Sequence, residues 1–561
     1  MSEVGETQSG RSTLAVATPT MRILFVLRTL HQLRYFQSTL ELLADRGHAL
    51  CLMLEYTQHG PREEAWLAEV LTRPNVTLAR SGSYRGMPMQ EWGVKLRIAL
   101  EYLHFRAPEY RSRPRYLRNV ARRSPPRLVR ALALLPGIRG TSGRRLLYRI
   151  LDALERVVAD PTPARMSLQA RRPDVLVLAD AGSRASVYVA FARAAQELGI
   201  PTASCVSSWD NLTTRPPMRT VPSKLLVWNE QQVEEAVRIH GIPEDRVVST
   251  GAPSFDQWFT WRARPSEDFI RRIGLAPSEH RILWVGSALN PWEPAEVPFV
   301  QAWLRGLRSS RHHSLREAGV VLRPHPLRMD QWHGAGFSDF GNVVVWPKRN
   351  VSMPIDVEQK SDYYDSIFHS HAVVGINTSA MIEASIIGRP VMTILDAGYH
   401  DSQFGALHFS YLLDSAGGVL RVSESLDEHL DALAEVLANS GDRYEAAREF
   451  AHRFARPHGL QSAVTPRVVE EIEQLATLAQ EPVAEQRAVV ACRRLVRPLA
   501  VTSYWLANPK RRRRIKNRTR RTVRRTVIKP LRSRRKRFVR ALRRNHLVVR
   551  VARPLRRFVS R

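Results

Sequence analysis

The segment from Ala372 to Ile394 holds residue types suited to binding a phosphate. Its apolar start ends in three residues that are favoured at the beginning of a helix: Asn377, Thr378 and Ser379. The first turn of a helix has backbone N–H groups without intrahelical partners, so it attracts anions. Glu383 follows on the first turns, on the side where a ribose would lie, and Gly388 ends the helix. The pattern predicts a strand, an anion-binding turn, a helix and a second strand; an ordinary capped helix in a parallel sheet is the alternative.

A second loop, SWDNLT at residues 208–213, offers an aromatic face together with hydrogen-bonding groups. Its polar and aromatic members are Trp209, Asp210, Asn211 and Thr213. Polar and aromatic side chains on a loop carried by a rigid sheet are a common way of holding a sugar. The alternative is an Asx-turn with Trp209 packed against an interdomain surface. Both interpretations stay open at this point.

Neither a metal site nor a disulfide framework is predicted. The chain has no Asp-x-Asp sequence and no histidine cluster at metal-ligand spacing. The three cysteines, Cys51, Cys205 and Cys492, lie far apart in the sequence. This usage favours a reducing compartment, and we expect neither a secretion signal nor a membrane-spanning segment.

The elements that position these residues form two α/β units. The first 20 residues are predicted to be disordered. From Met21, a buried strand, a helix and the strand ALCLMLEY start a doubly wound parallel sheet, which resumes at Asp174 after a basic, mostly helical insertion at about 90–166. Residues 21–262 are therefore predicted to form an N-terminal Rossmann-like domain.

A second α/β unit begins at Arg281 with RILWVGSA. The strands GVVLRPHP and NVVVWP alternate with predicted helices and lead into the segment that begins at Ala372. Residues 263–480 are predicted to form a C-terminal Rossmann-like domain. In open α/β sheets, ligands bind at the carboxyl ends of the strands, so we expect the site in the cleft between the two domains.

The formal net charge of +32 is concentrated at the C-terminal end. From Lys510 to Arg561 there are 25 Lys and Arg residues and no Asp or Glu, which leaves +7 for the other residues. Apolar residues are interleaved, so residues 486–561 are predicted to be a basic amphipathic tail suited to an anionic membrane surface. Nucleic-acid binding and a solvated, disordered tail are the alternatives. The tail has few aromatic residues on which bases can stack, so nucleic acid is less favoured.

Four short motifs on these elements resemble motifs of the GT-B glycosyltransferase superfamily. TGAPSFD, at 250–256, resembles segments of UDP-N-acetylglucosamine 2-epimerases and CDP-glycerol glycerophosphotransferases. LRPHP, at 322–326, is similar to the His-Pro motif of those transferases and of bacterial sialyltransferases. The Thr-Ser pair at 378–379 matches their Ser/Thr pair, and EA at 383–384 with GRP at 388–390 resembles their Glu-Ala and Gly-x-Pro positions. The resemblance covers about 21–454 and implies an α/β fold of two Rossmann-like domains facing across a cleft. The helical insertion in the first domain and the basic helical or disordered C-terminal tail are predicted from the residues alone.

The resemblance implies a donor site in the second domain. His325 would contact the donor's phosphate or nucleotide, and its proton would stabilise the charge of the leaving nucleotide. Glu383 would accept hydrogen bonds from ribose hydroxyls, and Gly251 would shape the hinge. The predicted donor-binding residues are Arg323, His325, Asn377, Thr378, Ser379, Glu383 and Gly251. A loop histidine satisfied by backbone and an ordinary helix-face glutamate are the alternatives for His325 and Glu383.

Transfer with inversion also needs a base that takes the proton of the acceptor hydroxyl, and the first domain should supply it. The candidates are Asp180, Asp210 and His31. The Asp-Glu-Gly motif that supplies the base in the sialyltransferases is absent. The predicted rim or acceptor contacts are Trp209, Asn211, His400 and Gln403.

Three functions are consistent with these features. The first is a metal-independent GT-B glycosyltransferase or glycerophosphotransferase-like enzyme. It would move a sugar or sugar-like group from a nucleotide-activated donor, CMP or CDP type favoured over UDP, to an envelope glycan or lipid-linked acceptor. The second is a UDP-N-acetylglucosamine 2-epimerase-like isomerase, and the third a non-catalytic nucleotide-sugar or nucleic-acid binding protein. No cofactor is expected beyond the substrate, and we expect a cytoplasmic protein, peripheral at the inner face of the plasma membrane.

Overall fold

The computed structural model describes residues 20–55, 61–81, 87–182, 185–348, 356–413, 417–439, 443–478 and 480–507. The chain divides into two compact units, residues 1–489 and 490–561. The first unit contains both α/β domains. Of the residues 1–20 that were predicted to be disordered, 1–19 lie outside the described residues, as does the basic run from Lys510 to Arg561.

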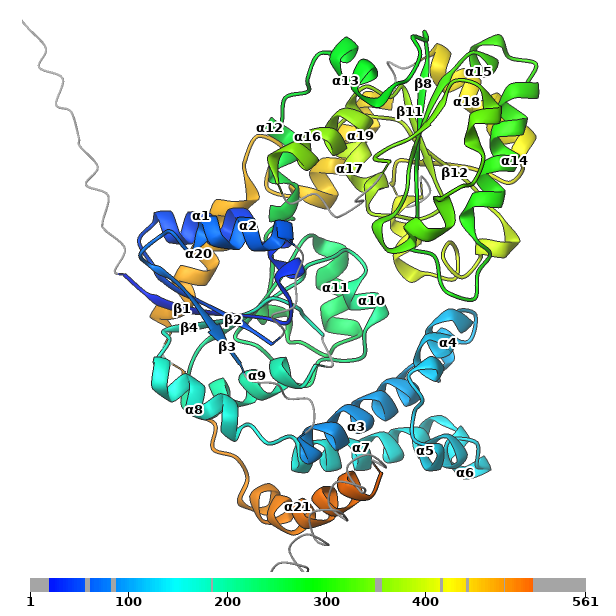
Figure 1. Cartoon of the computed structure of the whole chain (residues 1–561). Coiled ribbons are helices and arrows are strands. Elements are labelled where there is room, and N and C mark those ends of the chain that lie inside the picture. Colours follow the sequence, from blue (N-terminus) through cyan, green and yellow to red (C-terminus); the bar gives the residue numbers. More distant parts are fainter. Residues whose placement is uncertain are drawn as a thin grey trace, which may run out of the picture. The chain divides into compact units, whose positions relative to one another are not determined.

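The first domain is built on a seven-stranded parallel sheet in the order β3-β2-β1-β4-β5-β6-β7 (Figure 1). The strands are β1 (Arg22–Leu27), β2 (Ala49–Leu54), β3 (Val76–Arg80), β4 (Val175–Leu178), β5 (Thr202–Cys205), β6 (Lys224–Val227) and β7 (Val247–Ser249). The apolar runs that predicted a doubly wound sheet form its central strands. The edge strand β3 was not predicted, because it is short, mostly exposed and shows little apolar periodicity.

Both faces of the first sheet are covered by helices. Alternate residues of β1 point to opposite faces, so Ile23 and Phe25 enter one apolar core while Leu24 and Val26 enter another. The first core is closed by α1 (Gln37–Asp45) and α20 (Val464–Thr477), and the second by α8 (Thr162–Arg171) and α9 (Ser186–Leu198).

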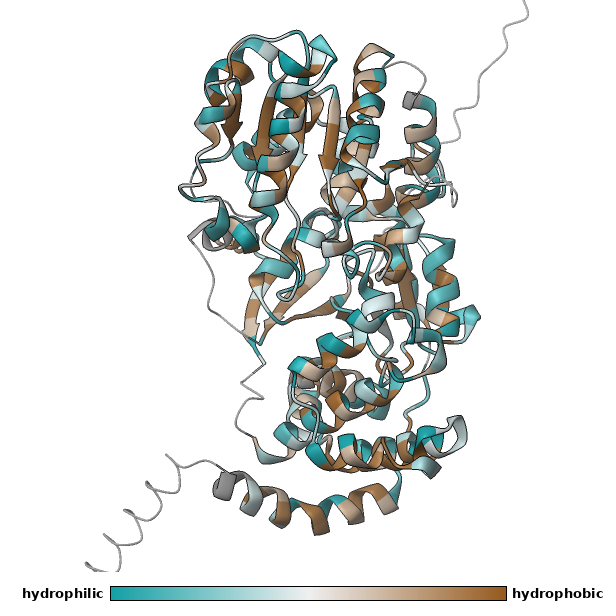
Figure 2. Cartoon of the chain, turned by 90° about the vertical axis from the view of Figure 1, so that its right-hand side faces the viewer, coloured by the Kyte–Doolittle hydropathy of each residue, from teal (hydrophilic) through white to brown (hydrophobic). Residues whose placement is uncertain are grey.

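The second domain has a six-stranded parallel sheet in the order β10-β9-β8-β11-β12-β13. The strands are β8 (Arg281–Val285), β9 (Gly319–Arg323), β10 (Val343–Val345), β11 (Ala372–Gly375), β12 (Val391–Ile394) and β13 (Leu420–Ser423). One face is covered by α14 (Glu296–Ser309) and α18 (Leu426–Ala438), and the other by α13 (Ser266–Ile273), α16 (Val357–Phe368), α17 (Ala380–Ile386) and α19 (Arg443–Ala455). The strands of both sheets are coloured as hydrophobic in Figure 2. The predicted pair of Rossmann-like domains, and with it the GT-B architecture, is confirmed.

Helix α20 packs on the first sheet although it lies at the end of the predicted second domain, 263–480. Its apolar side enters the core that contains β1 and β4. The apolar residues involved are Val464, Val468, Val469, Ile472 and Leu475. The helical periodicity of apolar residues in a sequence indicates that one side of a helix is buried. It does not indicate which of the two sheets that side packs against.

The predicted insertion is a helical subdomain with its own core. It comprises α3 (Pro88–His104), α4 (Pro114–Arg122), α5 (Arg127–Leu132), α6 (Pro136–Arg139) and α7 (Thr141–Val158). Helices α3 and α7 lie side by side and bury Leu100, Leu103, Leu147 and Leu151 (Figure 1). Prolines divide this region into short helices, since Pro126 caps α5 and Pro136 starts α6.

Helix α21 (Arg487–Ala507) is the described part of the predicted basic tail. Among the described residues, no helix combines the length and the apolar character needed to cross a membrane.

Candidate functional site

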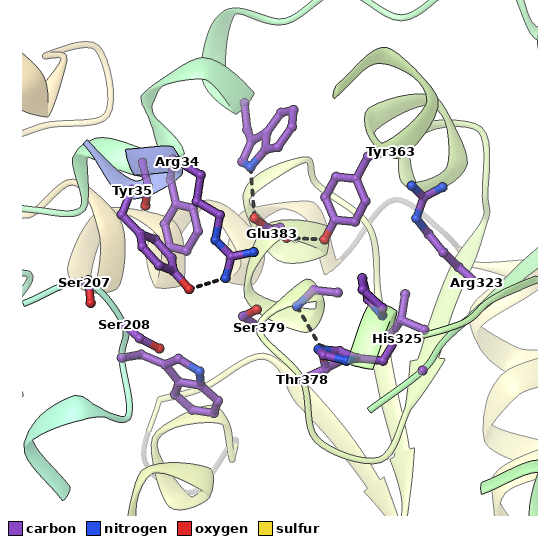
Figure 3. Close-up of a pocket in the computed structure, with 18 of the residues that line it drawn as sticks. Arg34, Tyr35, Ser207, Ser208, Arg323, His325, Tyr363, Thr378, Ser379 and Glu383 are labelled. Atoms are coloured by element: carbon purple, nitrogen blue, oxygen red, sulfur yellow. Dashed lines mark hydrogen bonds between the residues drawn. The ribbon is translucent and has the colours of Figure 1, made fainter. Parts of the chain in front are cut away.

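A pocket in the described structure is lined by residues of both domains, and most of them follow the carboxyl ends of parallel strands (Figure 3). Residues 34–35 come after β1, residues 207–209 after β5, and residues 285–286 and 323–326 at the ends of β8 and β9. Residues 378–383 follow β11. The sequence analysis predicted a site at this edge of the two sheets.

Arg34 provides a positive charge on the first-domain side of the pocket. Its guanidinium lies 4.4 Å from the centre of the Tyr35 ring and donates from Nη2 to the Tyr35 hydroxyl. Its Nε–H is buried without a hydrogen-bond partner in the described structure. A buried donor without a partner is costly, so this group is suited to an anionic ligand.

His325 stands at the end of β9 as the cap of the following turn. Its Nδ1 accepts a hydrogen bond from the backbone N–H of Leu327 at 3.2 Å. Burial, with a smaller contribution from Arg34 and Arg328, lowers the pKa of His325 to about 4. The imidazole is therefore neutral at pH 7, and because Nδ1 is the acceptor, Nε2 carries the proton.

Gly286 allows the end of β8 to approach His325 closely. Its backbone N–H donates to the carbonyl of Arg323 at 2.8 Å. A Cβ at this position would lie 2.6 Å from the backbone nitrogen of His325. Real Cβ contacts are essentially never that short, so the position of the histidine depends on a glycine here.

Arg323 lies in the pocket wall but is already engaged by α16. Its Nη1 donates to the Ser366 hydroxyl at 2.9 Å, and the guanidinium lies 4.9 Å from the centre of the Tyr363 ring. Burial lowers the pKa of Arg323. These contacts indicate that Arg323 holds β9 against α16 and adds positive charge at the back of the pocket.

Thr378 and Ser379 place two hydroxyls in the pocket wall, at the start of α17. Ser379 is exposed, and its side chain makes no capping hydrogen bond. Because the hydroxyl is not used to cap the helix, it is available to a ligand.

Glu383 is the carboxylate of the pocket wall, and it has two protein donors. Its Oε1 accepts from the Trp258 indole N–H at 3.2 Å, and its Oε2 accepts from the Tyr363 hydroxyl (Figure 3). Burial raises the pKa of Glu383, while both hydrogen bonds act in the opposite direction. Trp258 belongs to α12 (Asp256–Thr260), so Glu383 also ties α17 to the segment that connects the two domains.

None of the three predicted base candidates lines the pocket. Asp180 is buried and forms an ion pair with the half-buried Arg215, and His31 is exposed on the turn after β1. Asp210 lies behind the wall and accepts a hydrogen bond at 2.6 Å from the hydroxyl of Ser208, which does line the pocket. Burial acts to raise the pKa of Asp210, but His408 and the Ser208 hydrogen bond outweigh it, so the pKa lies below its usual range.

Several predicted contacts lie outside the pocket wall because local hydrogen bonds engage them. Asn377 donates to the carbonyl of Ser402, and Asn211 accepts from the backbone N–H of Ser207 at 3.2 Å. Gln403 donates to the carbonyl of Ile394 at 2.8 Å. The predicted contacts not in the wall are Asn377, Gly251, Asn211, His400 and Gln403, whereas Arg323, His325, Thr378, Ser379, Glu383 and Trp209 line it.

Gly251 and Asp256 instead build the connection between the domains. Gly251 has φ +98°, and a Cβ there would lie 2.8 Å from the Ala455 carbonyl. The Asp256 carboxylate accepts from Arg456 Nη2 at 2.8 Å and from the backbone N–H of Thr465 at 2.7 Å. The TGAPSFD motif thus joins the chain segment that leaves the first domain to the one that returns to it.

The sequence analysis missed several residues of the pocket wall. They are Arg34, Tyr35, Ser207, Ser208, Trp258, Gly286 and Tyr363. Arg34, Ser207 and Gly286 each follow a predicted strand, so their place at a carboxyl end was a usable signal. Tyr363 and Trp258 lie on helices, and only the packing of α12 and α16 brings them to Glu383.

No protein-family model and no curated protein sequence matches the chain. Among solved structures, the chain is similar to a UDP-GlcNAc 2-epimerase from Methanocaldococcus jannaschii, with TM-score 0.45 and 12% identity over 81% of this chain and 100% of the other. It is similar to a glycosyltransferase from Rickettsia africae, with TM-score 0.45 and 9% identity over 82% and 99%. It is also similar to Anabaena HepE, solved with UDP and glucose, with TM-score 0.44 and 10% identity over 82% and 100%. The GT-B architecture assigned here rests on the two sheets and their order.

Proposed function

We propose that this chain is a GT-B transferase that moves a sugar or sugar-like group from a nucleotide-activated donor to an envelope glycan or lipid-linked acceptor. The observation that supports it is a set of hydrogen-bond donors from both domains around one pocket at the strand ends. They are the Arg34 guanidinium, the His325 Nε2–H and the Thr378 and Ser379 hydroxyls. Such a set fits the phosphate of a nucleotide.

In this proposal, the pocket stabilises the negative charge that develops on the leaving nucleotide. Arg34 supplies a permanent positive charge, since arginine stays protonated at any ordinary pH. His325 acts as a neutral donor through Nε2, because its pKa of about 4 keeps it uncharged at pH 7. Donors that are already oriented act without reorganisation during the reaction, and removing one such donor typically slows catalysis by about 100-fold or more.

The acceptor side of the reaction needs a base. We propose that Asp210 is this base and that the Ser208 hydroxyl relays the proton to it. The acceptor hydroxyl would give its proton to the Ser208 oxygen as that hydroxyl's own proton passes to Asp210 along the 2.6 Å hydrogen bond. The acceptor oxygen would form the new bond to the transferred group while the bond to the leaving phosphate breaks. Among the described residues, the first-domain wall contains no carboxylate or imidazole that contacts the pocket directly.

The experiment that tests the proposal is thermal stabilisation of the full chain by CMP, CDP, UDP, GDP and their sugar conjugates. We expect one nucleotide class to raise Tm, with CMP or CDP preferred on the strength of the His-Pro and Thr-Ser pairs. Arg34→Gln should abolish most of that shift. Arg311→Gln, at an exposed ion pair in the second domain, is the matched control and should retain it. If no nucleotide raises Tm, the transferase proposal is rejected.

A second measurement separates transfer from epimerisation. UDP-N-acetylglucosamine and a sugar conjugate of the nucleotide class that raises Tm are each incubated with the chain, and the nucleotide sugar is recovered and analysed. Release of free nucleotide that depends on an added acceptor supports transfer, whereas recovery of a 2-epimer with no nucleotide released supports the isomerase. An epimerase must move a proton at the second carbon of the sugar, and in the described structure Glu383 is the pocket's carboxylate and is held by Trp258 and Tyr363.

A further inference from the structure

Helix α7 of the insertion exposes an apolar stripe. Leu146, Ile150 and Leu154 recur at every fourth position and therefore lie along one side of the helix. They are 61%, 49% and 45% exposed. An adjoining face of α7 packs Leu147 and Leu151 into the core of the insertion, whereas the residues of the stripe are exposed.

Arginines line the neighbouring side of the same helix. Arg145, Arg149 and Arg156 are exposed there, at spacings that place them next to the apolar stripe. Of the two acidic residues of α7, one pairs with an exposed arginine of this row and the other is buried. Asp152 accepts from Arg156 and Arg219, and Glu155 is buried between arginine side chains, Arg97 and Arg193, at 2.6 Å each.

The short helices before α7 also expose apolar side chains next to arginines. Three further exposed leucines and three exposed arginines occur there: Leu128, Leu134, Leu135, Arg127, Arg130 and Arg139. Gly143 lets α6 approach the start of α7, since a Cβ there would overlap the carbonyl of Gly137. From Ser124 to Val158, every exposed Asp, Glu, Lys or Arg is an arginine.

We propose that this surface, formed by α5, α6 and α7, docks on an anionic lipid bilayer. The exposed leucines and isoleucine would enter the boundary between headgroups and acyl chains, while the arginines bind anionic headgroups. Charge complementarity favours this occupant over two others. A second copy of the chain, or the chain's own basic tail, would bring positive charge against positive charge.

Nucleic acid is also a poorer fit than lipid. Phosphate contacts account for arginines, but they leave the apolar stripe exposed to water. An interfacial surface uses both kinds of side chain at once. This proposal rests on the proposed function and deepens it, because it gives the first domain, which we expect to bind the acceptor, a membrane contact independent of the C-terminal tail. The membrane contact and the donor pocket are tested by separate measurements.

The first test places a polarity-sensitive fluorophore on the stripe of the full chain. The exposed Cys492 is replaced by Ser, and Ile150→Cys is labelled; Cys51 and Cys205 lie in strands of the first sheet. Vesicles of phosphatidylglycerol and phosphatidylcholine should shift the emission to the blue and allow quenching by quencher-bearing lipids. Phosphatidylcholine alone should do neither. A label at the exposed Val357 of the second domain is the control and should stay unshifted.

The same experiment has two outcomes that overturn the proposal. In one, vesicles sediment the chain but the label at residue 150 stays in water, which means that another segment makes the membrane contact. In the other, anionic vesicles do not bind the chain at all.

A second test uses Leu146→Ser, Ile150→Ser and Leu154→Ser together in the full chain. The side chains are exposed, so Tm should stay close to that of the wild type. Partition onto anionic vesicles should fall at least about tenfold, given the apolar surface removed. The matched control carries Ser at three other exposed apolar positions, Val237, Val357 and Leu478, and should bind as the wild type does. Equal partition of the two triple variants would refute the proposal, and an unchanged nucleotide response in both keeps this result separate from the donor site.

Discussion

The imidazole of His325 accepts a hydrogen bond at Nδ1 from the backbone N–H of Leu327, at 3.2 Å. This bond fixes the ring as the cap of the turn after β9 and leaves the proton of the neutral ring on Nε2. The same bond therefore sets both the orientation of the side chain and its ability to donate to a ligand. The two roles can be separated by substitution.

His325→Asn should keep the cap and lose the donor, whereas His325→Gln should do the reverse. The Asn side-chain oxygen can accept from Leu327 but has no group at the position of Nε2. We expect the Asn variant to keep the wild-type Tm and to bind nucleotide about tenfold more weakly, the loss of about one hydrogen bond. The Gln variant should lose about 1 kcal/mol of stability and keep more of its affinity. Calorimetric titration and thermal melts measure both, and equal affinities would show that Nε2 contacts nothing in the complex.

Gly286→Ala should displace His325 and weaken nucleotide binding. The new Cβ would meet backbone atoms 2.6 Å away, which cannot move aside as a flexible side chain can. We expect a stability loss of about 1–3 kcal/mol, typical of overpacking, together with a smaller nucleotide-induced shift in Tm. Gly137→Ala is the control, since a Cβ there meets nothing within 4 Å. A wild-type response from Gly286→Ala would contradict the close approach of β8 to the His325 turn.

Glu383→Gln tests whether the carboxylate contacts the ribose. The amide oxygen can still accept from one of Trp258 and Tyr363, so we expect the fold to persist. A hydroxyl that donates to a carboxylate forms a stronger hydrogen bond than one that donates to an amide, so nucleotide affinity should fall about tenfold. Trp258→Phe removes a protein donor to Glu383 and is the comparison. The ratio of the affinity for a nucleotide to the affinity for its free base is compared among the two variants and the wild type. If this ratio is the same in all three, Glu383 does not contact the ribose and only holds α17 against the neighbouring helices.

Asp256→Ala should release α20 from the connection between the domains. Asp256 and Arg456 are largely buried, and removing one partner leaves the other charge uncompensated. Breaking a buried pair of this kind costs about 3–5 kcal/mol. Denaturant titration and proteolysis between residues 457 and 463 should both report the loss. Asp268→Ala, at an exposed pair with Arg271, should change stability by less than about 0.5 kcal/mol.

His429 should make the second domain sensitive to acid. Burial, with a smaller contribution from Arg421, lowers its pKa to about 3, and neither ring nitrogen has a hydrogen-bond partner in the described structure. The unfolded chain takes up a proton near pH 6.5 and the folded chain does not, so stability is complete above pH 6.5 and falls as the pH drops toward 3. At pH 5 the loss is about 2 kcal/mol. His429→Leu should reduce the difference in unfolding free energy between pH 7 and pH 5 by that amount, whereas His452→Leu, at an exposed position on α19, should leave it unchanged.

The sequence predicted those parts of the molecule that local pattern determines. Central strands are apolar runs bounded by turn residues, and the Thr378 turn follows one of them, so both domains and the donor side of the pocket were foreseeable. The edge strand β3 was not foreseeable, since it lacks the apolar pattern. The packing of α20 on the first sheet was not foreseeable either, since it depends on which sheet surface the other helices leave exposed. The same limit applies to charged groups. Asp180 follows a strand as a site residue should, but its ion pair with Arg215 appears only in three dimensions.

The two chain segments that connect the domains run side by side. The backbone N–H of Ala252 donates to the carbonyl of Ala455 at 2.9 Å, and Asp256 binds both Arg456 and the start of α20. Arg34 and His325 line the pocket from different domains. Any rotation about these links would therefore change the distance between the two side chains, and with it the fit of the pocket to a ligand.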